Sequence, residues 1–379
     1  MSINGRRIHV AGSASKGADG QLLAAAHSMI GDAVSLIVEA GGGLVAGTGD
    51  EPIGESGQAC TFDWTILERL AEAPDPAPNW PGRPEARFRL VASQRALEKI
   101  PESRRDVWEK IRERSDFELE TAPAGWRMGG TIRTMQVRRG DVLVALSGGG
   151  GTEQLAELYV EDGKPVIPVH CDLGAIVDDG KGGSTYLHGR ALSDVDGFFA
   201  IRDGVGGAAA RLSALRLTAT SDPRVVATAL VALLEDLRPP IAFYARLLNR
   251  DSDSFDAVER FFRNVVDRVV LDTGFTPHEV GRDPPQAAFL NVEIFETLHK
   301  AGLVVVDLTD VRPNCTMELG YALGRGRRVM ISAKKGTRLP FDPDKLPTYF
   351  WDEEGTLEDH VKRYQEWFEH HLDMPPVAK

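Results

Sequence analysis

Asp141-Val-Leu-Val-Ala-Leu-Ser-Gly-Gly-Gly-Gly-Thr-Glu-Gln-Leu-Ala-Glu-Leu-Tyr159 is the stretch that decides the fold of the first half of the chain. Residues 141–146 form an apolar, partly β-branched run, which is typical of a strand buried on both faces of a parallel sheet. Glycines occupy positions 148–151, and the helical spacing after them predicts a helix with Thr152 as its N-cap. Glycines at such a junction leave backbone N–H groups open beside the positive end of the helix dipole, which favours a bound phosphate.

The alternative for this stretch is a tight strand-to-helix turn that binds nothing. Consecutive glycines at 148–151 exceed what such a turn requires, so we expect an anion site there. The pattern matches neither G-x-G-x-x-G nor G-x-x-x-x-G-K-[ST]. It therefore identifies neither a Rossmann dinucleotide site nor a P-loop.

The composition is that of a folded, acidic protein. A chain of 379 residues can form two domains with separate cores, and its net charge of −12 argues against partners such as nucleic acid or an anionic membrane. The cysteines, Cys60, Cys171 and Cys315, lie far apart, and no H-E-x-x-H motif occurs, so we expect neither disulfides nor a metal. The N-terminus lacks the apolar core of a signal peptide, and we expect no apolar run of about 18 residues, which predicts a cytoplasmic protein.

The first half alternates strands, glycine-rich loops and helices. Strands are predicted at 7–11 and 44–46, a helix at 22–37, and polar loops at 12–17 and 47–52. This order is typical of a doubly wound α/β sheet, in which ligands bind at the carboxyl ends of the strands. We therefore expect the loops at 12–17, 47–52 and 147–152 to converge.

The predicted fold class is α/β, with two doubly wound parallel-sheet (Rossmann-like) domains joined by a helical linker. Residues 1–203 form the first domain, residues 204–240 the alanine- and leucine-rich linker, and residues 241–379 the second domain. Within the second domain the strand at 303–307, the helix at 316–324 and the strand at 328–332 are the clearest elements.

Four polar residues in the second domain are candidate catalytic groups. Asp307 ends a buried strand, Asp310 and Asn314 lie in the turn after it, and Glu318 opens the next helix, so both Asp307 and Glu318 are expected to face the crevice at the sheet edge. Two carboxylates suit attack on a glycosidic carbon, because the sugar passes through an oxocarbenium-like state. The alternative is structural, with Asn314 or Thr316 capping the helix and Glu318 favouring its dipole.

Arginines just before the central strand, at positions 127, 133, 138 and 139, are candidate phosphate contacts, although most arginines simply solubilise a surface. The loop at 178–184 is either a lid or an ordinary surface loop. The expected ligand-binding residues of the first domain are Gly12, Ser13, Glu51, Arg127, Arg133, Gly148, Gly149, Gly150, Gly151, Thr152, Glu153 and Lys181.

Residues 1–203 resemble the SLOG superfamily, which includes LOG phosphoribohydrolases and Smf-type proteins, and in particular the branch fused to sirtuin or TIR domains in Thoeris-type antiphage systems. The motifs that carry the resemblance are 10–13 (Val-Ala-Gly-Ser), 47–52 (Gly-Thr-Gly-Asp-Glu-Pro), 128–133 (Met-Gly-Gly-Thr-Ile-Arg), 147–156 (Ser-Gly-Gly-Gly-Gly-Thr-Glu-Gln-Leu-Ala), 164–168 (Lys-Pro-Val-Ile-Pro) and 182–184 (Gly-Gly-Ser).

The hydrolytic LOG pattern, P-G-G-x-G-T-x-x-E, is changed at two positions. Leu155 stands where that pattern has its catalytic glutamate, and Ser147 replaces its proline, while Glu153 and Glu157 flank Leu155 on other faces of the helix. The resemblance therefore implies a sensor for a nucleotide signal, such as a cyclic ADP-ribose isomer. A hydrolase that uses Glu153 or Glu157 is the alternative.

Residues 241–379 resemble the nucleoside 2-deoxyribosyltransferase-like and TIR-like group, on the motifs at 304–310, 313–322, 329–332 and 339–342. In that group the glutamate of E-[LI]-G is the nucleophile on the sugar, and it corresponds to Glu318. Deoxyribosyltransferases carry an aspartate six residues earlier, where Arg312 stands here. The resemblance thus implies an N-glycosidase that acts on NAD or a nucleotide.

Together these features predict a bacterial defence protein in which nucleotide binding to the first domain regulates an N-glycosidase in the second. We expect no cofactor other than a nucleotide ligand or NAD as substrate, and a homo-oligomer by resemblance to Thoeris-like effectors. The rival interpretation is a binding protein that senses or sequesters nucleotides and cleaves nothing.

Overall fold

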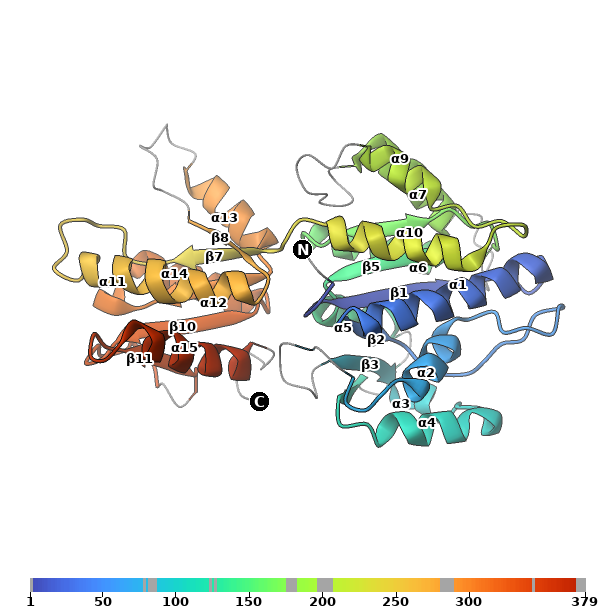
Figure 1. The fold of residues 1–379 in the computed structure, drawn as a ribbon, viewed down its shortest axis with the longest axis horizontal. Helices are drawn as coiled ribbons and strands as arrows, with labels where there is room; N and C mark the ends of the chain where they lie inside the picture. The colour runs from blue at the N-terminus through green and yellow to red at the C-terminus, as the bar shows by residue number, and fades with distance from the viewer. Residues whose placement is uncertain are drawn as a thin grey trace. The chain divides into compact units, whose positions relative to one another are not determined.

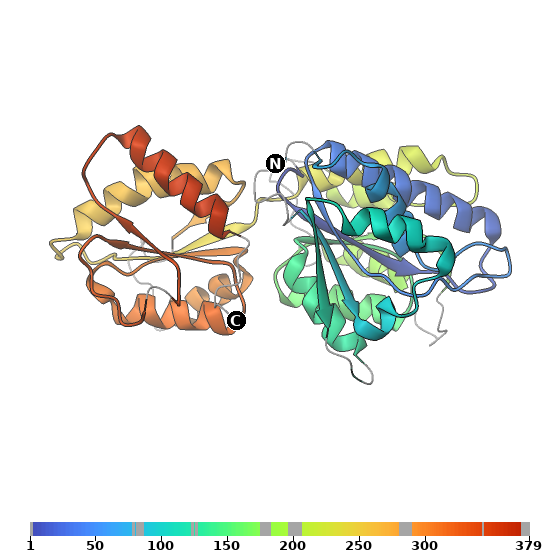
Figure 2. The same ribbon diagram turned by 90° about the horizontal axis from the view of Figure 1, so that it is seen from below.

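The computed structural model describes residues 3–77, 80, 87–122, 125, 128–174, 183–195, 207–279, 290–342 and 345–372. The chain divides into two compact units between Arg238 and Pro239. Each unit is built on one parallel sheet with helices on its two faces (Figures 1 and 2). The predicted α/β class, with two doubly wound Rossmann-like domains, is confirmed.

The sheet of the first unit has the strand order β4-β3-β2-β1-β5-β6. Its strands are β1 (Arg7–Ser13), β2 (Gly43–Ala46), β3 (Phe88–Ser93), β4 (Phe117–Ala122), β5 (Val142–Ser147) and β6 (Val166–Val169). The chain builds outward from β1 to β4, then returns to β5 on the other side of β1. The junction of β1 and β5 is therefore the topological switch point, where open α/β sheets bind their ligands.

Helices cover both faces of this sheet (Figure 2). They are α1 (Gly20–Glu39), α2 (Asp63–Glu72), α3 (Gln94–Leu97), α4 (Arg105–Arg112), α5 (Gly129–Arg139), α6 (Gly150–Glu161), α7 (Gly183–Ser193), α9 (Ala208–Ala214) and α10 (Pro223–Asp236). Helices α9 and α10, from the segment expected as a linker, belong to this unit: Leu212, Leu230 and Leu233 lie in its core.

Helix α1 shows how local sequence and burial act together. The carboxylate of Asp19 accepts a hydrogen bond of 2.8 Å from the backbone N–H of Leu22, which caps the helix. By length and composition α1 is apolar enough to cross a membrane, so the expectation that no such stretch occurs is wrong. The helix is this apolar because it belongs to the core: it packs on the sheet and on α10, and 56% of its 18-residue apolar stretch is buried.

The sheet of the second unit has the order β11-β10-β9-β7-β8. Its strands are β7 (Ile241–Ala245), β8 (Thr276–His278), β9 (Leu303–Asp307), β10 (Val329–Lys334) and β11 (Thr348–Trp351). Its helices are α11 (Phe255–Phe261), α12 (Asp267–Asp272), α13 (Leu290–Lys300), α14 (Pro313–Gly324) and α15 (Leu357–His371). The direction of winding changes between β7 and β9, which is the switch point of this sheet.

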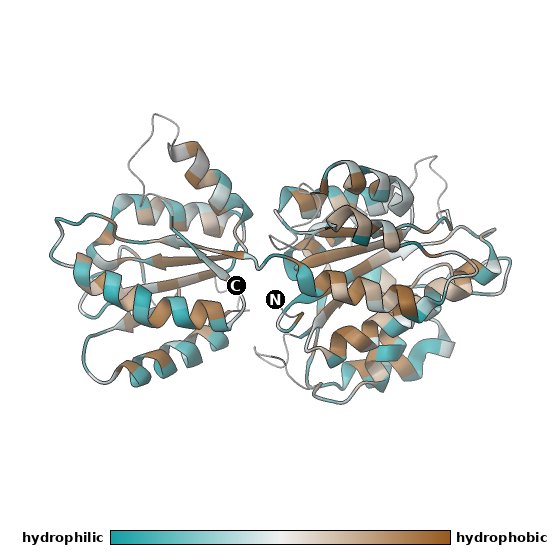
Figure 3. Cartoon of the chain, turned by 45° about the horizontal axis from the view of Figure 1, so that its top comes forward, coloured by the Kyte–Doolittle hydropathy of each residue, from teal (hydrophilic) through white to brown (hydrophobic). Residues whose placement is uncertain are grey.

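Two separate apolar layers hold the second unit together. Helices α11, α12 and α15 cover one face of the sheet, and α13 and α14 cover the other (Figure 2). The strands carry the apolar residues and the outer faces of the helices carry the polar ones (Figure 3). This is the pattern expected for parallel strands that are buried on both faces.

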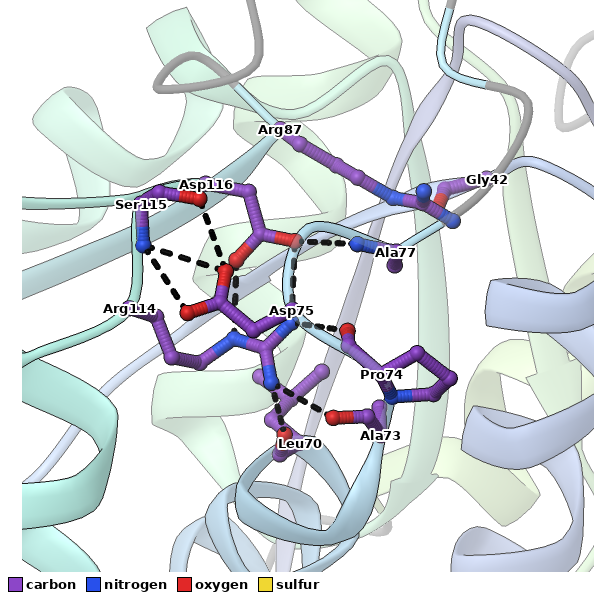
Figure 4. A network of polar contacts seen from close by, with 10 residues as sticks. All are labelled: Gly42, Leu70, Ala73, Pro74, Asp75, Ala77, Arg87, Arg114, Ser115 and Asp116. Atoms are coloured by element: carbon purple, nitrogen blue, oxygen red, sulfur yellow. Dashed lines mark hydrogen bonds and ion pairs between the residues drawn. The ribbon is translucent and has the colours of Figure 1, made fainter.

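A buried ion pair fastens the loop between α2 and β3 to the start of β4 (Figure 4). The guanidinium of Arg114 donates two hydrogen bonds to Asp116, at 2.8 and 2.9 Å, and further bonds to the carbonyls of Leu70, Ala73 and Pro74. Asp116 also accepts a bond of 2.8 Å from the N–H of Ala77. Both charges are thus satisfied inside the protein, the condition under which a buried pair is tolerated.

Candidate functional site

The glycine loop lies at the switch point of the first sheet. In the register of β1 with β5, Gly12 lies opposite Leu146 and Ser13 lies opposite Ser147. The N–H of Gly148 donates to the carbonyl of Ser13 at 2.8 Å. The predicted convergence of the loops at 12–17 and 147–152 is therefore confirmed.

Two of the glycines are required by this packing rather than by a ligand. A Cβ on Gly12 would lie 1.7 Å from the carbonyl oxygen of Leu146. Gly148 has a φ of +82°, and a Cβ there would lie 2.1 Å from Oγ1 of Thr152. The part of the loop that remains open is the start of α6, where Gly151 is exposed.

Ser147 holds the loop in a conformation that a proline cannot adopt. Its φ is +53°, whereas the proline ring fixes φ near −65°. The Ser147 hydroxyl donates to the carbonyl of Gly174 at 2.8 Å, and its backbone N–H donates to the hydroxyl of Ser184. A proline at this position would not allow this backbone, which is tied to Gly174 and Ser184.

Helix α6 begins three residues earlier than predicted. Gly149 is its N-cap residue, with no side-chain cap bond, so Thr152 is not the N-cap. The reason is that Gly150 and Gly151 already have helical conformation. The first backbone N–H groups of the helix therefore come from glycines, next to which no side chain projects from the backbone.

Arg133 of α5 supplies positive charge beside this helix end. A Cβ on Gly151 would lie 3.5 Å from Nη1 of Arg133, so the guanidinium lies against the start of α6. The Nε of Arg133 is buried and has no hydrogen-bond partner among the described residues. Burial lowers the pKa of this guanidinium. A half-buried cation with an unused donor, next to the N-terminus of a helix, is suited to a phosphate oxygen.

The acidic residues of α6 are engaged elsewhere. Glu153 accepts a hydrogen bond of 2.9 Å from the N–H of Gly183, and Glu157 pairs with Arg190. Leu155 is only 3% exposed and belongs to the core. None of the three places a free carboxylate at the glycine loop.

The other expected ligand-binding residues of the first unit are in ion pairs, exposed, or outside the described residues. Glu51 forms an ion pair with Arg104, which also contacts Glu68. Arg139 pairs with Glu120 at 2.6 Å, while Arg138 is exposed. Arg127, Lys181 and most of the expected 178–184 loop lie outside the described residues.

A polar pocket lies next to the glycine loop, where the predicted loops converge. It has a volume of about 200 Å³ and is lined by Gly12, by Gly47 and Thr48 after β2, by Asp63 of α2 and by Gln136 of α5. Thr48 and Gln136 are 8% and 9% exposed. The hydroxyl of Thr48 has no hydrogen-bond partner among the described residues. The loop at 47–52 thus reaches the same sheet edge as Gly12, as predicted.

In the second unit, Asp307 does not face the crevice as expected. It is 0% exposed, and its carboxylate accepts hydrogen bonds from the N–H of Thr309, the hydroxyl of Ser332 and the indole of Trp351 at 2.8–3.0 Å. Burial raises its pKa, while these hydrogen bonds oppose the rise. Asp307 therefore ties β9 to β10 and β11.

Asp310 connects the two loops that meet at the second switch point. Its carboxylate accepts hydrogen bonds from the hydroxyls of Ser252 and Ser254, at 2.5 and 2.9 Å, in the loop after β7. Asp310 and Val311 have φ values of +64° and +43°, which is rare for residues other than glycine. Asn314 is exposed on the first turn of α14.

Glu318 is the half-buried carboxylate of this group. Helix α14 begins at Pro313, with Arg312 as N-cap, so neither Asn314 nor Thr316 caps it and Glu318 lies in the second turn. Its carboxylate is half-buried and has no hydrogen bond or ion pair with the described residues. Burial raises the pKa of Glu318 to about 7. A carboxyl group that titrates near neutral pH is typical of catalytic acids, bases and nucleophiles.

No group of three or more His, Cys, Asp or Glu side chains in the described part of the chain is placed to hold a metal ion. The three cysteines are buried and free.

Comparison with known proteins gives one matching family. The family model described as "ATP nucleosidase Cap17-like, N-terminal" matches residues 3–234. Two curated proteins called ATP nucleosidase Cap17, one from Escherichia coli (strain KTE188) and one from Escherichia coli, are each 32% identical over 182 residues. The match covers 48% of this chain and 35% of each relative, so it spans about a third of the length of the curated relatives.

Proposed function

We propose the following function for this chain, which belongs to the family of ATP nucleosidase Cap17-like N-terminal regions. The first unit binds a phosphorylated nucleotide at the glycine loop. This binding regulates the second unit, which cleaves an N-glycosidic bond of ATP, another nucleotide or NAD through Glu318.

The observation that carries the binding half is the placement of Arg133. Its guanidinium lies against the start of α6, at the switch point of the sheet, and keeps a buried Nε donor unused. Phosphate is the anion that suits a helix N-terminus joined to an arginine. The net charge of −12 makes such a local cationic site the exception on this protein.

The first unit is proposed as a binding site rather than a hydrolase. A LOG-like reaction uses a glutamate of the helix after the glycine loop, but in α6 Leu155 stands at that position and is buried, Glu153 holds the N–H of Gly183, and Glu157 pairs with Arg190. Using either glutamate for catalysis would break the contact it now makes. A signal such as a cyclic ADP-ribose isomer remains a candidate ligand for this site.

The cleavage half rests on Glu318 and on the name of the relatives. A nucleosidase breaks the bond between C1′ of the sugar and a nitrogen of the base. In the proposed reaction the Glu318 carboxylate attacks C1′, the base departs with the bonding electrons and takes up a proton, and water then hydrolyses the glycosyl ester and restores the carboxylate. Glu318 lies outside the matched residues 3–234, so this assignment is supported by the burial and raised pKa of its carboxylate and by the resemblance of the second unit.

The pH dependence of cleavage is a first expected result. A nucleophilic Glu318 must be ionised, and burial raises its pKa to about 7. The rate of base release is therefore expected to be constant at high pH, to fall through pH 7, and to drop about tenfold per unit at lower pH. The measurement is kcat for base release between pH 5.5 and 9. A rate that instead rises as the pH falls through 7 would assign Glu318 the role of a general acid.

The Arg133→Ala variant tests the phosphate site. A charge-assisted hydrogen bond contributes about 1.5–3 kcal/mol, so Arg133→Ala is expected to weaken ATP binding roughly 10- to 100-fold. Titration calorimetry on the full chain gives the two Kd values. Arg138→Ala is the matched control, because Arg138 is exposed on the same helix. Equal Kd values for Arg133→Ala and Arg138→Ala would contradict the proposed site.

We propose bacterial antiphage defence in the cytoplasm as the setting of this activity, with a homo-oligomer as the working form. The relatives from Escherichia coli and the resemblance to the SLOG branch support this setting. Size-exclusion chromatography with light scattering, with and without ATP, tests the oligomer.

A further inference from the structure

The polar pocket beside the glycine loop contains hydrogen-bonding groups that the fold does not use. The hydroxyl of Thr48 is buried and unpartnered among the described residues. The Gln136 side chain, 9% exposed, makes no hydrogen bond with any described residue. A buried polar group without a partner, such as the Thr48 hydroxyl, costs about 1–3 kcal/mol. Its position in one pocket with the unbonded Gln136 amide indicates that a polar ligand binds there.

Asp63 adds a carboxylate to this pair. Its Oδ1 lies beside the backbone of Gly47, where a Cβ on Gly47 would be 3.4 Å from it. Burial raises the pKa of Asp63 to about 6, and the neighbouring backbone of Gly47 opposes the rise. At pH 8 the group is therefore a carboxylate that can accept hydrogen bonds. The pocket's other polar side chains, His9 and Ser93, already have partners: Nδ1 of His9 is 3.1 Å from the Tyr159 hydroxyl, and the Ser93 hydroxyl accepts a hydrogen bond of 3.1 Å from the N–H of Ala96.

The size of the pocket fits one part of a nucleotide. Its volume is about 200 Å³, while pockets that enclose a whole small molecule have roughly 300–1,000 Å³. Its remaining walls are aliphatic side chains, including Val10, Val91 and Ile132. No Phe, Tyr or Trp is among the described lining residues, so the pocket offers no large ring on which a base can stack.

The short distance between the pocket and the glycine loop indicates that the pocket holds the sugar of the nucleotide. Gly12 lines the pocket, and the next residue, Ser13, accepts the hydrogen bond from Gly148. One residue of a strand spans about 3.3 Å, so the pocket directly adjoins the proposed phosphate site. In a 5′-nucleotide the ribose is bonded to the phosphate, and the base lies beyond it. Helix α5 contributes to both the phosphate site and the pocket: Arg133 lies at the glycine loop, and Gln136, one turn later, lines the pocket.

We propose that Thr48, Asp63 and Gln136 bind the 2′- and 3′-hydroxyls of the ribose whose 5′-phosphate lies at the glycine loop. Asp63 accepts hydrogen bonds from the two adjacent hydroxyls, and the side chains of Thr48 and Gln136 form the remaining hydrogen bonds with them. The first unit therefore selects ribonucleotides over deoxyribonucleotides. This inference rests on the proposed nucleotide site and specifies its ligand class.

The test compares the binding of ATP, 2′-deoxy-ATP and 3′-deoxy-ATP to the full chain at pH 8 by titration calorimetry. Because a missing hydroxyl leaves buried partners unpaired, ATP is expected to bind at least about tenfold more tightly than either deoxy analogue. Asp63→Asn and Thr48→Val are expected to weaken ATP binding and reduce this preference to less than about threefold. Glu72→Gln, an exposed change on the same helix, is the matched control and is expected to keep the preference.

The outcomes separate the two proposals. Equal binding of ATP and both deoxy analogues by the wild type would overturn the ribose pocket and leave the phosphate site standing. A preference that persists in both Asp63→Asn and Thr48→Val would also overturn it. Failure of all three nucleotides to bind would overturn the nucleotide site and the ribose pocket together. Circular dichroism of each variant shows whether it is folded.

Discussion

Glu318→Gln is expected to lower the release of free base from ATP and from NAD by about a thousandfold or more, which is ~4 kcal/mol in the barrier. Glutamine keeps the size of the side chain but is neutral and a poor nucleophile, so it can neither attack C1′ nor balance positive charge on the sugar. The measurement is chromatographic quantification of adenine and nicotinamide under single-turnover conditions.

The control for this variant is Glu366→Gln, which makes the same chemical change at an exposed position on α15. It is expected to retain the wild-type rate. A Glu318→Gln protein that releases base at the rate of Glu366→Gln would rule out Glu318 as the nucleophile. Absence of release from every nucleotide tested with the wild type would favour the rival interpretation, a protein that only binds nucleotides.

Arg114→Ala is expected to destabilise the first unit by about 3–5 kcal/mol, because it leaves the buried Asp116 without its cation. The carbonyls of Leu70, Ala73 and Pro74 would also lose a donor. The measurement is urea unfolding of the full chain followed by circular dichroism, with the transition of the first unit compared between variants.

Two further variants make this test specific to the ion pair. Arg112→Ala changes an exposed arginine two residues earlier and is expected to cost less than about 0.5 kcal/mol. The double variant Arg114→Met/Asp116→Leu removes both charges and is expected to recover a large part of the loss. A loss of less than about 1 kcal/mol in Arg114→Ala would show that water replaces the guanidinium.

The sequence predicted those parts of the fold that have strong local signals. The apolar runs of β5 and β9 and the amphipathic stretch of α1 are recognisable from their composition and period. Strands β4 and β7 were not predicted. Only Ala122 of β4 is buried, so this edge strand lacks an apolar run. β7 directly follows Pro239-Pro240, and a pair of prolines favours a break in regular structure rather than a strand.

The site was predictable only where glycines mark it. The glycine loop and its approach to Ser13 followed from the order of elements, since parallel strands bring their carboxyl ends to one edge. Thr48, Asp63 and Gln136 belong to three elements and form no motif, so only the folded chain reveals that they share a pocket. The burial of Asp307 depends on Ser332 and Trp351, which are distant in the sequence, so its inward orientation had no local signal.

The central claim is that a nucleotide binds at the glycine loop, separately from any cleavage at Glu318. The most direct test is titration of ATP into Glu318→Gln, which is expected to leave the nucleotide intact, and into the same protein with Arg133→Ala added. The account predicts that adding Arg133→Ala weakens one binding event at least about tenfold, whereas adding Arg138→Ala does not. Identical titrations for the three proteins would contradict it.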